Sequence, residues 1–94
     1  MKQADITLEN NTLQVSGELD YFNVMSVYNK GLSLLPNDQQ AVVDFSRLQD
    51  ANSAGVALMI AWKKRWQNVE FRHVSPELKS IATVSGLVEL LALS

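Results

Sequence analysis

The stretch from Asn52 to Trp62 constrains the fold more than any other part of this sequence. Every position from Ala54 to Trp62 is apolar or glycine, which amounts to more than two turns of an α-helix. A surface helix ordinarily carries one apolar stripe and one polar face. A β-sheet covers only one side of a helix, so the other sides must lie against neighbouring helices or a partner protein. Contiguous exposed apolar patches usually mark interaction sites, which favours a partner.

The N-terminal part of the chain predicts a hairpin followed by a helix. Polar and apolar residues alternate over 5–9 and 12–16, as in half-buried strands, and an Asn-Asn turn joins the two runs. A helix is expected over 21–35, with Asp20 as its plausible N-cap. Its apolar stripe is predicted at helical spacing: Met25, Tyr28, Leu32 and Leu35.

The remaining elements alternate between strand and helix. A mostly apolar strand is expected over 41–45, and a helix over 53–66 capped by Asn52 or Ser53. A strand follows over 69–74, and Ser75-Pro76-Glu77 then opens a third helix that Gly86 stops. The apolar segment 87–93 fits either a short helix or an edge element, and the sequence does not decide between them.

The resulting order of elements is β-β-α-β-α-β-α. Right-handed crossovers place both following helices on one face of the sheet. We therefore expect an α/β fold: a two-layer sandwich with a mixed sheet of about four strands and helices packed mainly on one face. With 94 residues, the chain is expected to form a single domain over 1–94.

The composition argues against several classes of function. A net charge of −2 gives no basic face for nucleic acid, and the absence of cysteine removes disulfides and thiolate metal sites. No glycine-rich phosphate loop, nucleophile elbow or HExxH motif is present, and His73 is the only histidine. We expect no catalytic residue, metal or cofactor. The charged N-terminus and the shortness of the apolar runs predict a cytoplasmic protein that reaches a membrane only through a partner.

The same apolar helix supplies the candidate site. Its predicted partner interface lies mostly in its first two turns: Asn52, Ser53, Ala54, Val56, Ala57 and Met59. Ser53 stands where unpaired N–H groups favour negative charge, so a phosphate there would act as a switch beside the apolar surface. The alternative is that Ser53 only caps the helix. Trp62 and Trp66, one turn apart, fit either a core or an interface.

Three segments in order resemble the STAS family over essentially the whole chain. Ser16-Gly17-Glu18-Leu19-Asp20 is similar to its strand-to-helix signature, Val43-Asp44-Phe45-Ser46 to its central strand, and Asn52-Ser53-Ala54-Gly55 to the motif that opens its second helix. The run 53–62 and the segment from Pro76 to Leu91 most resemble STAS subunits of the MlaB type.

This resemblance implies a non-catalytic subunit that binds and regulates the ATPase of a bacterial phospholipid-transport ABC complex, which maintains outer-membrane lipid asymmetry. The competing subfamily consists of anti-sigma-factor antagonists, in which a partner kinase phosphorylates the motif serine, here Ser53. The residue before that serine is usually acidic but is Asn52 in this chain. An asparagine supplies no carboxylate to a kinase site, which favours docking over phosphorylation.

Overall fold

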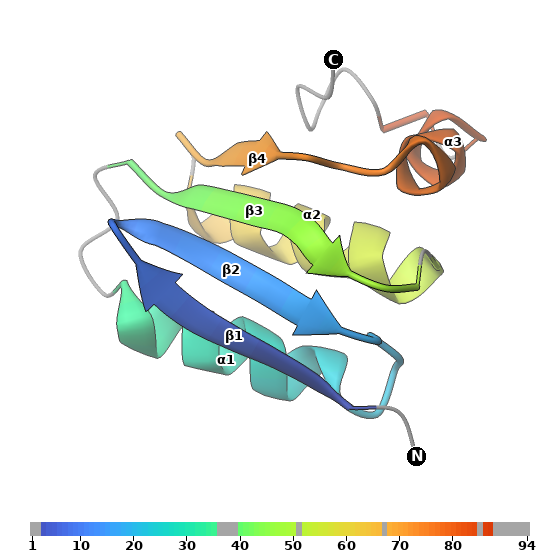
Figure 1. Ribbon diagram of the computed structural model, residues 1–94. Coiled ribbons are helices and arrows are strands. Elements are labelled where there is room, and N and C mark those ends of the chain that lie inside the picture. The colour runs from blue at the N-terminus through green and yellow to red at the C-terminus, as the bar shows by residue number, and fades with distance from the viewer. Residues whose placement is uncertain (1–2, 36–39, 51, 67, 85, 88–94) are drawn as a thin grey trace.

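The computed structural model describes residues 3–35, 40–50, 52–66, 68–84 and 86–87, and its elements follow the predicted order (Figure 1). The strands are β1 (Ala4–Glu9), β2 (Thr12–Gly17), β3 (Val42–Leu48) and β4 (Glu70–Arg72), and the helices are α1 (Val24–Leu34), α2 (Ser53–Arg65) and α3 (Pro76–Val84). Most of the C-terminal segment 87–93, whose form the sequence leaves open, lies outside the described residues.

The four strands form one mixed sheet in the order β1-β2-β3-β4. β1 and β2 are antiparallel, and both of their turn residues, Asn10 and Asn11, have positive φ, which is the geometry of tight hairpin turns. β2 pairs with β3 and β3 with β4 in parallel, so each of these pairs needs a crossover helix. β3 reaches Leu48, beyond the predicted end at residue 45, because Gly17 still pairs with Leu48 after a shift in register.

Both crossover helices lie on the same face of the sheet. In Figure 1, α1 runs behind β1, and α2 runs behind β3, while α3 packs against α2. This arrangement confirms the predicted two-layer α/β fold with helices mainly on one face. None of the helices in the described part of the chain is long and apolar enough to cross a bilayer.

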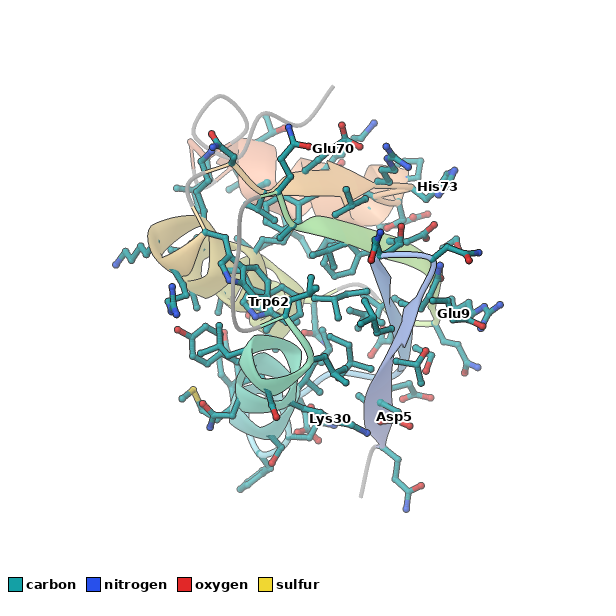
Figure 2. All side chains as sticks on the ribbon, turned by 90° about the vertical axis from the view of Figure 1, so that its left-hand side faces the viewer. Asp5, Glu9, Lys30, Trp62, Glu70 and His73 are labelled. Atoms are coloured by element: carbon teal, nitrogen blue, oxygen red, sulfur yellow. The ribbon has the colours of Figure 1, made fainter. Side chains whose placement is uncertain are left out.

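The apolar helix α2 is enclosed on three sides. The sheet lies beneath it, and α1 and α3 flank it. Trp62 fills the space above Gly31 of α1 (Figure 2) and stacks on Trp66 with ring centroids 5.7 Å apart. Toward the other end, the side chain of Leu78 from α3 lies against Gly55. Both tryptophans are 0% exposed, so they belong to the core.

The predicted stripe of α1 is wrong at Met25, which is 59% exposed. The other stripe residues are half-buried and pack against the core: Tyr28, Leu32 and Leu35. The fully buried face consists of Val24, Val27 and Gly31.

The helix begins at Val24, later than the predicted residue 21. Asp20 nevertheless has the predicted bonding of a cap: its Oδ1 atom accepts from the N–H groups of Phe22 and Asn23, and its carbonyl accepts from the N–H of Val24. Asn23 directly precedes the helix and forms no side-chain cap bond.

The edge strand β1 is tied to α1 by a carboxylate. Asp5 Oδ1 accepts hydrogen bonds from the backbone N–H of Ile6 at 2.8 Å and from Lys30 Nζ at 2.7 Å (Figure 2). The hydrogen bond from Lys30 is the main reason that the pKa of Asp5 is below its ordinary value. A charged side chain on an edge strand also discourages pairing with another sheet.

Candidate docking site

The start of α2 is tied to the segment that follows β2 by the side chain of Asn52. Its Oδ1 atom accepts a hydrogen bond from the backbone N–H of Ala54 at 2.9 Å. Its Nδ2 atom donates to the carbonyl oxygen of Leu19 at 2.8 Å. Of the two predicted caps, Asn52 is therefore the N-cap residue, and it also joins α2 to the chain before α1.

Ser53 is the first residue of α2 and is exposed. Its Oγ atom lies 2.7 Å from the hydroxyl oxygen of Tyr21, so the two hydroxyls share a hydrogen bond. Because Asn52 caps the helix, the hydroxyl of Ser53 is directed to the surface instead. The first turn of α2 holds no acidic side chain.

The turn before α1 is fixed by a reciprocal pair of side chains. Asp20 Oδ1 accepts from the backbone N–H groups of Phe22 and Asn23, both at 2.8 Å. Asn23 Oδ1 accepts from the N–H of Asp20 at 2.9 Å, and Asn23 Nδ2 donates to the carbonyl of Glu18 at 2.9 Å. These bonds hold the turn in one conformation, and that conformation leaves Phe22 in solvent.

Large apolar side chains gather at this turn. Tyr21 is 67% exposed, Phe22 is 88% exposed, and Met25 lies on the following turn of chain. The Tyr21–Ser53 hydrogen bond joins them to α2, where Ala57 is half-buried one turn after Ser53. We call Tyr21, Phe22, Met25, Ser53 and Ala57 the docking surface. Exposed apolar patches of this kind usually mark interaction sites.

The structure divides the predicted interface into accessible and inaccessible residues. Ser53 is exposed, and Asn52 and Ala57 are half-buried. Three other residues of the predicted interface are at most 4% exposed and belong to the core: Ala54, Val56 and Met59. The preference for a partner over neighbouring helices as their cover is wrong, because the sheet, α1 and α3 enclose that side of α2.

The exposed side chains of the first helix were missed by the sequence reasoning. Helical spacing placed Met25 on the buried stripe, and the helix expected over 21–35 included Tyr21 and Phe22. The signal that could have found them is the Asp20–Asn23 pair, since these residue types favour turns through side-chain bonds to the backbone. A turn at 20–23 takes Tyr21 and Phe22 out of the helical pattern.

A groove of about 1000 Å³ lies beside the docking surface and opens to solvent. Two backbone hydrogen bonds join residues that line it: the N–H of Glu18 donates to the carbonyl of Gln3, and the N–H of Gln49 donates to the carbonyl of Gly17. Gly17 has φ +83°, and a Cβ atom at this position would collide with the carbonyl of Gln3. Tyr21 and Phe22 line the groove on the side of the docking surface.

Asp44 and His73 join β3 to the segment after β4. His73 Nδ1 lies 3.0 Å from Asp44 Oδ2, and Asp44 Oδ1 accepts from the N–H of Ser46 at 2.7 Å. Burial raises the pKa of Asp44, but hydrogen bonds from Ser46 and His73 outweigh it, so the pKa lies below its ordinary value. Within the described residues, no group of three or more His, Asp or Glu side chains could hold a metal ion.

An open mixed sheet of four strands with helices mainly on one face, and a motif serine at the start of α2, define a STAS-type domain. A family model described as "MlaB, STAS domain" matches residues 3–92. The chain therefore belongs to this STAS family. No curated protein matches the chain.

Among solved structures, the chain is similar to the anti-sigma factor antagonist SpoIIAA in its unphosphorylated form. The two share 21% sequence identity with a TM-score of 0.63, over 93% of this chain and 82% of the SpoIIAA chain. At this identity the likeness establishes the STAS fold.

Proposed function

We propose that this protein is a non-catalytic subunit that binds and regulates the ATPase of a bacterial phospholipid-transport ABC complex of the Mla type. It would act in the cytoplasm and reach the inner membrane only through that ATPase. Through the complex it would help to maintain the lipid asymmetry of the outer membrane. The contact is made by the docking surface together with the exposed part of Asn52.

The observation that carries this proposal is the exposure of Phe22, at 88%, next in sequence to Tyr21, whose hydroxyl is hydrogen-bonded to the motif serine. An aromatic side chain that a hydrogen-bonded turn leaves in solvent adds little to the stability of the folded monomer. At interfaces, by contrast, aromatic anchors often contribute most of the binding energy. The turn bonds of Asp20 also hold the backbone at Phe22 before any partner binds, which lowers the entropic cost of association. The MlaB description of the matching family supports the choice of an ATPase as partner.

Capture of the ATPase by Ser53→Glu and Ala57→Asp variants tests this proposal. Each change adds a negative charge to the docking surface, and we expect either one to abolish capture. Val84→Asp is the matched control, since Val84 is 90% exposed in the last turn of α3, outside the docking surface. Thermal unfolding of each variant alone checks that the fold is kept. If both docking-surface variants still capture the ATPase, the proposed surface is wrong.

One observation favours a second function, that of an anti-sigma-factor antagonist switched by phosphorylation. Ser53 is exposed at a helix N-terminus whose first turn carries no acidic residue, a place that tolerates an added phosphate. Incubation with a cognate kinase and ATP, followed by intact-mass measurement, separates the two functions. A gain of one phosphate that disappears in Ser53→Ala would favour the switch, and an unchanged mass would favour docking alone.

A further inference from the structure

The groove beside the docking surface differs from it in charge. The docking surface carries no ionised side chain, whereas two acidic residues, Glu18 and Asp20, are among the residues that line the groove, together with Gln3 and Gln49. No Lys, Arg or His is among the lining residues. Among the described ion pairs, none involves Glu18 or Asp20. The groove therefore offers negative charge without a cation from the described part of this chain.

The same groove offers aromatic surface. Tyr21 and Phe22 line it, and both side chains are mostly in solvent. Aromatic faces next to carboxylates suit one protein side chain above others, because an arginine guanidinium stacks on rings and binds carboxylates through paired N–H groups. A lysine ammonium is more strongly hydrated and lacks the planar face.

We propose that this groove receives an arginine side chain of the partner that covers the docking surface. This inference rests on the proposed function, since Tyr21 and Phe22 belong to both surfaces and one partner would cover them together. In this arrangement the carboxylate of Glu18 pairs with the guanidinium. Phe22 belongs both to the apolar docking surface and to the groove that holds this ion pair. Such an arrangement fixes the orientation of the partner, because a displaced arginine would leave Glu18 desolvated and unpaired.

Glu18→Gln is the variant that tests the inference. It removes the charge but keeps the side-chain length, and the backbone bonds of Glu18 to Gln3 and Asn23 stay unchanged. Asp20 is unsuitable because its carboxylate holds the turn. Glu9→Gln is the matched control: it makes the same chemical change at the opposite end of β1 from the groove. The measurement is the Kd for the ATPase at several salt concentrations.

We expect Glu18→Gln to raise the Kd about tenfold at low salt, as for loss of a charge-assisted hydrogen bond, and to flatten its salt dependence. Glu9→Gln should match the unchanged protein. If Glu18→Gln binds as tightly as the unchanged protein while Ala57→Asp does not bind, the arginine inference is overturned and the proposed function stands. If Ala57→Asp, Ser53→Glu and Glu18→Gln all bind normally, both are overturned.

Two other occupants of the groove are distinguished by the same variant. Lys2 precedes Gln3 in the sequence, so an ammonium of this chain is one competitor. If Glu18→Gln loses its effect on the Kd when Lys2→Gln is also present, the carboxylate acts through Lys2 and the inference is overturned.

A second copy of the chain is the other competitor. A Glu18-dependent dimer of the isolated protein in analytical ultracentrifugation would overturn the inference as well.

Discussion

At the scale of single residues, Asn52 shows why an amide can stand before the motif serine. Its oxygen caps α2 and its nitrogen donates to the carbonyl of Leu19. If residue 52 were an aspartate, one carboxylate oxygen could still accept the capping hydrogen bond. The other oxygen would face the carbonyl oxygen of Leu19, and two acceptors cannot form a hydrogen bond. We expect Asn52→Asp to lower the free energy of unfolding by about 0.5–1.5 kcal/mol, the usual value of one hydrogen bond. Urea unfolding at neutral pH measures this loss, and a variant as stable as the unchanged protein would contradict the role of the amide.

Asp44 gives a residue-scale prediction about pH. Because its folded-state pKa lies below the ordinary value of 3.8, Asp44 stabilises the fold fully above that pH. The contribution is lost as the pH falls through the lower folded-state pKa. Between about pH 5 and pH 2, the urea midpoint should therefore fall less steeply in Asp44→Asn than in the unchanged protein. Asp5 titrates in both proteins, so the difference isolates Asp44, and equal slopes would contradict the prediction.

At the scale of elements, the contact between α1 and α2 depends on the lack of a side chain at Gly31. A Cβ atom there would lie 2.7 Å from Cζ2 of Trp62, which is fully buried and stacked on Trp66. Alanine favours helices over glycine by about 1 kcal/mol, but overpacking a core typically costs about 1–3 kcal/mol. We expect Gly31→Ala to be destabilising, as measured by thermal or urea unfolding. Ser33→Ala, at an exposed position of the same helix, should be neutral or stabilising.

The same contact explains what the sequence could and could not predict. Turn residues and alternation predicted the order of the strands and helices in the described part of the chain, because Asn10-Asn11, Ser75-Pro76 and Gly86 act locally. The place of Gly31 in the buried face of α1 was beyond such reasoning, since Gly31 has no side chain to contribute to a hydrophobic pattern. Its role becomes visible only when Trp62, far along the chain, occupies the space.

The covering of α2 was unpredictable for a related reason. Its apolar residues are compatible with both a partner and neighbouring helices, and the choice depends on how closely those helices approach. Gly55 permits that approach, since its missing side chain leaves room for Leu78 of α3. The sequence therefore located the start of α2 as the candidate site but assigned core residues such as Met59 to its surface.

At the scale of the whole molecule, the docking surface draws on two segments at one end of the sheet. In Figure 1, the starts of α1 and α2 both lie beyond the carboxyl ends of β2 and β3. The fold, and not the sequence between them, holds Phe22 and Ser53 in one surface. A domain of this size usually unfolds as one cooperative unit, and a partner that binds only the folded state stabilises all of it equally.

Hydrogen exchange of this chain with and without the ATPase tests that coupling. At a free ATPase concentration of about 100 Kd, binding adds about 2.7 kcal/mol to the free energy of unfolding. Amides that exchange only by global unfolding, expected in the central strands β2 and β3, should then exchange about 100-fold more slowly, although they lie outside the docking surface. The Ala57→Asp variant should show no such slowing. Slowing confined to the start of α2 would mean that the docking surface opens separately from the core, and that the fold does not act as one unit in binding.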